Sequence, residues 1–347
     1  MRIAWFLGDN PKEYNTSAHR CDVPAKRLAK AGHRCYVAHM AEILQGSLSP
    51  ETAVEVAQAD VIVLERLLML ESHSFISEQK SLGKQVWATF DDHYGLIPGS
   101  VSYETWRGGK KALDGRGSIL KEFRQGLRIC TGYMTPSKML TEAYSMYNPH
   151  GQYVPNYLDD EIWSNLPARN SSLITIGWGG TSLHNSSWKE SGIIPALGSI
   201  CKNNRDVVVH VQPVYPDVVS LMEHWGVRYA LGNWQPFSEW PKTVAKFSIG
   251  VAPLDGGRYD DHRSNLKVLE YATAGIPWVA TDSSPYRGCE GGILVKNSVN
   301  GKNWYRALSE VILNLRVDNN KMGEDGREWA DKFNSECVKR YEEVLGG

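Results

Sequence analysis

The stretch from Phe247 to Asp282 constrains the fold most, because two buried-strand patterns flank one short helix in it. The apolar runs at residues 247–253 and 278–282 have the length and composition of central strands in a parallel sheet. Between them, a helix of about three turns is expected to start near Asn265 and to end at Gly275. A strand, a helix and a second strand in this order predict a parallel α/β unit.

The first turn of this helix favours a phosphate ligand. Its free N–H groups and the helix macrodipole attract negative charge. Lys267 would add a point charge, and Glu270, three residues further on, could accept two hydrogen bonds from ribose hydroxyls. Ser264 or Asn265 can cap the helix. The pattern therefore predicts a nucleotide diphosphate ligand.

Alternation of strands and helices continues along the chain in two blocks. In the first block we expect strands at 2–7, 61–64 and 85–90 and helices at 23–31 and 76–82. In the second block we expect helices at 188–202, 217–225, 237–246 and 303–315, followed by a final helix at 322–344. These patterns predict α/β architecture with two doubly wound parallel sheets facing each other across a cleft.

The domain boundary is expected in the stretch between Tyr153 and Ile174, where Pro and Asn punctuate the chain and no long helix fits. The first domain would cover 1–155. The second would cover 156–328 and contain the expected nucleotide diphosphate site. The helix at 329–347 could pack back on the first domain.

Composition is that of a globular protein, with 347 residues, 22% charged residues and a net charge of −1. The sequence has no apolar run of membrane-spanning length and no signal peptide, so we expect a cytoplasmic protein. Its six Cys are scattered without a C-x-x-C pair, which indicates neither a zinc site nor a disulfide framework.

One segment, residues 106–128, is strongly basic, with seven Lys or Arg against two acidic residues. Three of these cations, Lys110, Lys111 and Arg116, lie among its glycines. The segment is either a solvated surface or a loop that grips a polyanion such as DNA.

Polar residues follow two of the expected strands at the sheet edge where ligands bind in α/β folds. They are Gly8, Asp9 and Asn10 after the first strand, and Asp91, Asp92 and His93 after the strand at 85–90. The first group is either a simple turn or a wall of a ligand site. In the second, an Asp could act as a general base and His93 could form a hydrogen bond to a ligand, although a turn with a helix cap is the alternative.

The segment SNLKVLEYATAGIPWVATD resembles the S-x-x-K-x-x-E-Y-x-x-x-G-x-P-V-V-A signature of GT-B glycosyltransferases, most closely the family 4-like group. Further motifs match in the same order over nearly the full chain. They are RLAKAGHRCYV, TPSKML, YVPNYLDDEIW and IGWGGTSLHNSSW.

The resemblance implies a role for each matching residue. Glu270 would hold the donor ribose, residues 233–237 would lie near the base, and residues 91–93 would meet the transferred sugar. The diphosphate would lie against Gly179, Gly180, Thr181, Arg263, Ser264, Asn265 and Lys267. Many members carry a Glu eight positions before the ribose-binding one, whereas this chain has His262, which leaves the sugar open.

The sequence thus predicts a hexosyltransferase that uses a nucleotide diphosphate sugar, UDP-sugar by preference, and closes two domains over it. No prosthetic group is expected, and because no D-x-D motif ends a strand, a metal is not required. The acceptor would be a saccharide, a lipid-linked glycan, a small molecule, or a hydroxymethylated pyrimidine in DNA gripped by residues 106–128. The alternatives are a nucleotide-sugar epimerase of the same fold and a non-catalytic sugar-nucleotide binding protein.

Overall fold

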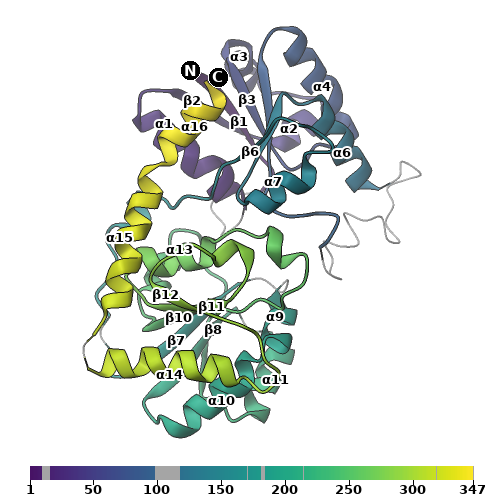
Figure 1. The fold of residues 1–347 in the computed structure, drawn as a ribbon. Coiled ribbons are helices and arrows are strands. Elements are labelled where there is room, and N and C mark those ends of the chain that lie inside the picture. The colour runs from purple at the N-terminus through teal and green to yellow at the C-terminus, as the bar shows by residue number, and fades with distance from the viewer. Residues whose placement is uncertain are drawn as a thin grey trace. The chain divides into compact units, whose positions relative to one another are not determined.

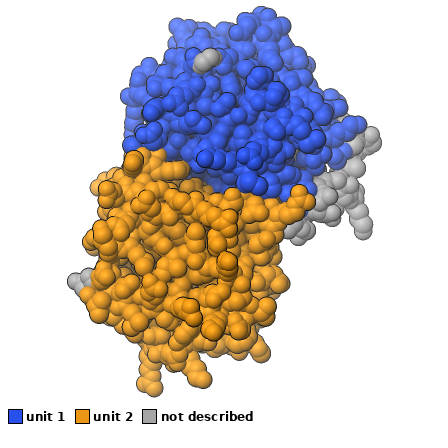
Figure 2. Space-filling view, in the orientation of Figure 1, with its two compact units in different colours: residues 1–158, 262–264, 335–347 blue, residues 159–261, 265–334 orange. Residues whose placement is uncertain are grey.

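A computed structural model describes residues 1–9, 16–97, 118–169, 171–180, 184–213, 215–317 and 319–346. The chain forms two compact units, coloured separately in Figure 2. Unit 1 contains residues 1–158, 262–264 and 335–347, and unit 2 contains residues 159–261 and 265–334.

Unit 1 is built on a six-stranded parallel sheet with the order β2-β1-β3-β4-β5-β6. Figure 1 labels β1, β2, β3 and β6 of this sheet. The strands are β1 (Arg2–Leu7), β2 (Arg34–His39), β3 (Val61–Glu65), β4 (Gln85–Thr89), β5 (Gly132–Thr135) and β6 (Gly151–Tyr153). The helices are η1 (Ala18–Asp22, a π-helical turn), α1 (Val23–Lys30), α2 (Met40–Leu44), α3 (Pro50–Gln58), α4 (Leu70–Ser81), α6 (Ile119–Ile129), α7 (Lys138–Tyr144) and α16 (Cys337–Leu345). Every residue of β3 is buried, as expected for a strand covered by helices on both faces.

Unit 2 contains a second six-stranded parallel sheet with the order β12-β11-β10-β7-β8-β9. Its strands are β7 (Ile174–Gly179), β8 (Val207–Gln212), β9 (Tyr229–Leu231), β10 (Ile249–Ala252), β11 (Trp278–Thr281) and β12 (Gly292–Val295). Its helices are α8 (Asp160–Trp163), α9 (Asn185–Glu190), α10 (Ile193–Asn203), α11 (Pro216–His224), α12 (Trp240–Val244), α13 (Leu266–Thr273), η4 (Ser284–Tyr286), α14 (Lys302–Arg316) and α15 (Lys321–Ser335). A further 3₁₀ turn, η3 (Asp260–His262), precedes α13. The prediction of two doubly wound parallel sheets is confirmed.

Each sheet has a point where the order of its strands reverses. In unit 1 the chain moves outward from β1 to β2 and then returns to the other side of β1 with β3. In unit 2 it moves outward from β7 through β8 to β9 and then returns beside β7 with β10. Right-handed crossovers place the helices of the two halves on opposite faces, so a crevice opens at the carboxyl ends of the two strands at the reversal.

Several of the expected helices differ from the structure. The helix expected at 188–202 is two helices, α9 and α10, which are separated by Gly192 in a left-handed conformation (φ +83°). The final helix is likewise divided into α15 and α16, whereas the helix expected at 76–82 begins earlier, as α4 at Leu70. The helix expected to span three turns from Asn265, α13, has only eight residues.

Helix α16 packs against unit 1 near the N-terminus of the chain. The ring of Tyr341 contacts that of Trp5 edge to face, with centroids 5.7 Å apart. Arg340 donates two hydrogen bonds to the carbonyl of Tyr153, at 2.9 and 2.7 Å. The last helix therefore completes the core of unit 1.

None of the helices in the described part of the chain is long and apolar enough to cross a membrane.

We expect Gly192→Ala to destabilise unit 2 much more than Gly226→Ala. Both glycines have positive φ, which costs an L residue roughly 1–2 kcal/mol. A Cβ at Gly192 would also lie 1.9 Å from the carbonyl oxygen of Ser298, whereas a Cβ at Gly226 would meet no atom within 4 Å. The free energy of unfolding in urea measures the difference, and equal losses in the two variants would contradict this packing.

Candidate functional site

The reversal point of unit 2 brings together the residues expected to bind a diphosphate. Lys267 lies in the first turn of α13, and its ammonium donates a hydrogen bond to the carbonyl of Gly179, the last residue of β7. The same ammonium lies 5.2 Å from the centre of the Trp178 ring. The loop after β7 and the start of α13, which are more than 80 residues apart in the sequence, therefore meet at one edge.

Close packing explains why glycines follow Trp178. A Cβ at Gly179 would lie 2.1 Å from the Trp240 ring, so this glycine is required by packing alone. A Cβ at Gly180 would lie 3.0 Å from the Lys267 ammonium. Both glycines therefore border the cation. The Gly180 N–H donates to the carbonyl of Gln212, and the Gly180 carbonyl accepts a hydrogen bond from the Tyr215 hydroxyl at 3.1 Å.

Glu270 lies one turn further along α13 than Lys267. Its residue surface is only 1% exposed. Its carboxylate adds to the burial of Tyr271 in raising the pKa of that phenol. A ribose at Glu270 would therefore have to displace the atoms that cover this side chain.

Residues 262–264, which end two positions before α13, belong to unit 1. The carbonyl of His262 accepts a hydrogen bond from the Ser137 hydroxyl at 2.8 Å. The Ser264 hydroxyl accepts one from the Asn156 side chain at 3.2 Å. Of the expected diphosphate residues, Arg263 and Ser264 thus group with unit 1, whereas Asn265 and Lys267 group with unit 2.

Asn265 occupies the N-cap position of α13, but its side chain makes no capping hydrogen bond. Its amide instead points to the thiol of Cys289, at 3.7 Å. Of the two residues expected to cap the helix, Ser264 and Asn265, it is Asn265 that occupies the N-cap, without a capping hydrogen bond from its side chain.

The segment expected to lie near the base follows β9. Trp234 in this segment is 44% exposed. The neighbouring Gln235 accepts a hydrogen bond from Thr243 of α12 at 2.7 Å, which fixes the segment to that helix. An exposed indole is suited to stacking on a planar ring.

In unit 1, Asp91, Asp92 and His93 follow β4 as a partly buried group. Asp91 accepts a hydrogen bond from the Thr16 hydroxyl at 2.9 Å. Burial and, to a smaller extent, Asp92 raise the pKa of Asp91 to about 7, although Arg66 and the hydrogen bond from Thr16 oppose the rise. The ring of His93 lies 4.7 Å from that of His262, centre to centre.

Gly8 and Asp9 lie at the reversal point of unit 1, beside two residues that the sequence did not single out. Glu65 ends β3 and accepts hydrogen bonds from the Gly8 N–H, at 2.7 Å, and from the Ser17 hydroxyl. Arg66 follows it and forms an ion pair with Asp9. In the sequence, Glu65 and Arg66 are visible only as a Glu-Arg dipeptide at the end of an apolar run. Such a dipeptide is indistinguishable from an ordinary strand end.

Several of the expected site residues lie outside the described residues. They are Asn10, Thr181, Lys110, Lys111 and Arg116. From the basic segment 106–128, helix α6 is described, and its Arg124 and Arg128 lie 4.9 and 5.2 Å from the centre of the Tyr147 ring. These two guanidiniums make cation–π contacts with the protein itself.

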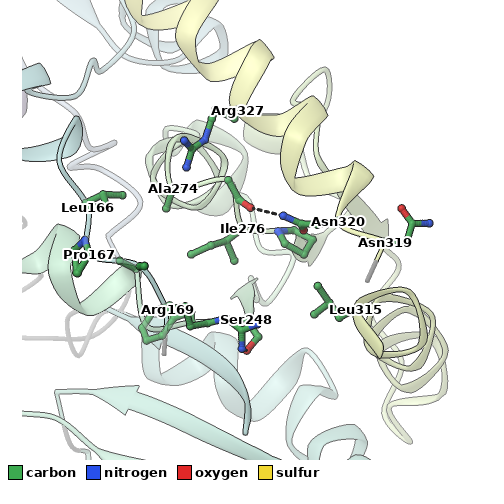
Figure 3. Close-up of a pocket in the computed structure, with 15 residues that line it drawn as sticks. Leu166, Pro167, Arg169, Ser248, Ala274, Ile276, Leu315, Asn319, Asn320 and Arg327 are labelled. Atoms are coloured by element: carbon green, nitrogen blue, oxygen red, sulfur yellow. Dashed lines mark hydrogen bonds between the residues drawn. The ribbon is translucent and has the colours of Figure 1, made fainter. Parts of the chain in front are cut away.

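A hollow of about 410 Å³ lies at the opposite, amino edge of the unit 2 sheet (Figure 3). Arg169 and Arg327 line it from different elements, and Arg169 donates a 2.7 Å hydrogen bond to Ser248 just before β10. Asn320 donates to the carbonyl of Gly275, which follows α13. None of the residues expected to bind the donor lines this hollow.

Solved structures share this architecture, although no protein-family model and no curated protein matches the chain. Anabaena HepE, solved with UDP and glucose, is 11% identical over 100% of both chains, with a TM-score of 0.64. TarM from S. aureus, solved with UDP and α-GlcNAc-glycerol, is 11% identical with a TM-score of 0.53. That match covers 83% of this chain and 55% of TarM, so this chain spans about half of TarM's length.

A putative UDP-N-acetylglucosamine 2-epimerase from Listeria monocytogenes has a similar fold. It is 11% identical with a TM-score of 0.53, over 99% of this chain and 97% of its own. Together with the two parallel sheets, these similarities show that the chain has the GT-B fold of two Rossmann-like domains.

We expect Asp91→Asn to become more stable relative to the wild type as pH rises. The folded pKa of Asp91, about 7, lies above its ordinary value of 3.8, so the folded state retains a proton that the unfolded state loses. This contribution to stability is complete below about pH 4 and is lost progressively up to about pH 7.

Asn cannot ionise, so the variant does not lose this contribution. Across this pH range its unfolding free energy should therefore rise by about 2–4 kcal/mol relative to that of the wild type. Urea unfolding at pH 4.5 and pH 7.5 measures it, with the exposed Asp331→Asn as the control. A difference that is flat with pH would show that Asp91 does not titrate near neutrality.

Proposed function

We propose that this chain is a glycosyltransferase that transfers a hexose from a UDP-sugar to an acceptor hydroxyl. The observation that carries the proposal is the meeting of the Lys267 ammonium with the end of β7 at the reversal point of unit 2. A cation, free helix N–H groups and a glycine backbone at one such edge suit a diphosphate. The structures of HepE and TarM with UDP support this choice of nucleotide.

In the donor complex, Lys267 would exchange the carbonyl of Gly179 for an oxygen of the diphosphate. As the bond between the sugar and the diphosphate breaks, negative charge builds up on the leaving UDP. The ammonium and the N-terminus of α13 stabilise that charge without having to reorganise. Glu270 accepts hydrogen bonds from the ribose hydroxyls once its cover is displaced.

The acceptor would be activated in unit 1. Its hydroxyl oxygen forms a bond to the anomeric carbon, and its proton passes to a carboxylate at the end of β4, with Asp91 and Asp92 as the candidates. A base with a pKa near neutrality matches the task of accepting a proton at physiological pH. His93 lies in the same group and can donate a hydrogen bond to the sugar.

The charges at this edge favour a neutral saccharide or small molecule as the acceptor. Among the described residues, the carboxylates of Asp9, Glu65 and Asp91 interact with the Arg66 guanidinium, and Asp92 follows Asp91. Such an edge repels a polyanion. Glycosylation of a hydroxymethylated base in DNA would need residues 106–117 to overcome this repulsion.

An epimerase of the same fold is the rival proposal, because the Listeria protein shares the architecture. It would bind the same nucleotide at the same edge of unit 2. The two reactions differ in the fate of the sugar, which leaves the nucleotide in a transferase and stays attached to it in an epimerase. A non-catalytic binding protein would leave the donor unchanged.

We expect Glu270→Ala to raise the dissociation constant of UDP at least tenfold. Hydrogen bonds to a charged group contribute roughly 1.5–3 kcal/mol each, and about 1.4 kcal/mol corresponds to a factor of ten. Isothermal titration calorimetry measures the constant. Glu270→Gln keeps the shape of the side chain and removes its charge, so it should reduce UDP affinity by an intermediate amount. This variant also shows whether folding is preserved without the charge.

Arg327→Gln is the matched control, because Arg327 lines the hollow at the opposite edge of the same sheet. It should leave UDP affinity unchanged. If Arg327→Gln weakens UDP binding and Glu270→Ala does not, the nucleotide binds in the hollow and the donor assignment is wrong.

A further inference from the structure

The hollow at the amino edge of the unit 2 sheet has no role in the proposed transfer. Its volume, about 410 Å³, falls within the range of roughly 300–1,000 Å³ that is typical of small-molecule sites. All of its lining residues belong to unit 2, so the packing of one unit forms it. They come from the segment before β7, the residues just before β10 and β11, the ends of α13 and α14, and α15 (Figure 3).

Arg327 of α15 brings a cation to the hollow that the rest of the described chain does not use. Its Nε and Nη2 would each lie 3.0 Å from a Cβ at Gly275, so the guanidinium lies at the end of α13. Within the described ranges it forms no hydrogen bond and no ion pair, although Glu324 and Asp331 lie one turn away on the same helix. Its five N–H donors are therefore available to a ligand.

Arg169 brings a second cation, which is anchored through one of its nitrogens. Its Nη1 donates to the Ser248 hydroxyl at 2.7 Å and to the carbonyl of Leu173 at 3.5 Å. Ser248 is buried, and its oxygen also accepts the N–H of Thr175 at 2.9 Å. The Nε and Nη2 of Arg169 donate to no residue that the structure describes. The guanidinium is thus fixed to the sheet edge and still offers two nitrogens.

The charge of the hollow is positive. None of its lining residues, all of them described, is acidic. Asp325 borders a smaller adjacent hollow, but its carboxylate is paired with Lys321 at 2.5 Å. The negative end of α13 carries only about half a unit charge, and the Asn320 amide covers the Gly275 carbonyl there at 3.2 Å. Two full positive charges outweigh this partial negative charge.

The wall between the two cations is apolar. In Figure 3, Ile276 lies between Arg327 and Arg169, and Leu315 lines another side of the hollow. Asn319 accepts the N–H of Lys321 through its Oδ1, at 3.2 Å, and its amide nitrogen donates to none of the described residues. The lining therefore suits a ligand with an anionic group, a carbon skeleton and hydroxyls.

We propose that this hollow is a binding site for a small organic phosphate such as a sugar phosphate. A phosphate monoester carries about −1.5 to −2 charges at neutral pH, which matches the two guanidiniums. The planar fork of Arg also fits phosphate oxygens. Ile276 and Leu315 would contact the carbon skeleton, and Asn319 would donate to a hydroxyl. This site lies at the opposite edge of the sheet from the donor site, so the inference does not rest on the proposed function.

The test is calorimetric titration of the full chain with ribose 5-phosphate, with and without saturating UDP. We expect saturable binding with the same affinity in both conditions, because the two ligands occupy opposite edges. Arg327→Gln should weaken it at least tenfold, since hydrogen bonds between charged groups are the strong ones. Arg327 has no partner among the described residues, so this variant should fold even if Arg169→Gln does not.

Arg306→Gln is the matched control. Arg306 is an exposed cation on α14 of the same unit and does not line the hollow. Its loss should leave the affinity for ribose 5-phosphate unchanged. Equal losses in Arg306→Gln and Arg327→Gln would show attraction to the general surface charge and overturn the inference. Displacement of ribose 5-phosphate by UDP would also overturn it, because the two would then share one site.

Two further ligands test the chemical class. Inorganic phosphate should bind more weakly than ribose 5-phosphate, because it lacks the skeleton that contacts Ile276 and Leu315. Malate carries a similar charge without a phosphate and should bind at least tenfold more weakly. Malate binding as tight as that of ribose 5-phosphate would overturn the assignment to phosphates. Wild-type protein that binds no ribose 5-phosphate at millimolar concentration would overturn the site itself, whereas a failure to bind UDP would count only against the proposed function.

Discussion

The reversal of strand order in each parallel sheet is the constraint on which the candidate sites depend. Strands on the two sides of a reversal send their connections to opposite faces, so no helix covers the carboxyl ends at that point. In unit 1 the reversal lies between β1 and β3, and in unit 2 between β7 and β10. Gly8 and Arg66 lie at the first, and Gly179 and Lys267 at the second.

The two edges differ in charge, and the difference matches the two tasks of a glycosyl transfer. The edge of unit 2 offers an ammonium and the N-terminus of α13, which suit a leaving diphosphate. The edge of unit 1 is rich in carboxylates, two of them buried enough to have raised pKa values, Glu65 and Asp91. A carboxylate whose pKa lies near neutrality, as that of Asp91 does, can accept a proton and bind a hydroxyl, so this edge suits an acceptor.

Sequence patterns predicted the two sheets and some of the residues at the carboxyl edge of each. These features have local signals in the sequence, such as the continuous apolar run of β3 and the pair of Lys267 and Glu270 on α13. The rest depends on contacts between distant residues. The two helices α9 and α10 are separated at Gly192, where the carbonyl of Ser298 leaves no room for a Cβ. Ser298 lies more than 100 positions away in the sequence. The Glu65-Arg66 pair was missed because neither burial at a strand end nor a positive φ at Arg66 can be read from residue types.

The most direct test of the account is to follow UDP-[¹³C]glucose by NMR in the presence of hydroxyl acceptors, including saccharides and hydroxymethylated DNA. We expect free UDP to accumulate while the labelled sugar moves to an acceptor or, more slowly, to water. A labelled sugar that remains on the nucleotide with a changed ring configuration would contradict transfer and identify an epimerase. A donor that binds and stays unchanged with every acceptor would contradict catalysis altogether.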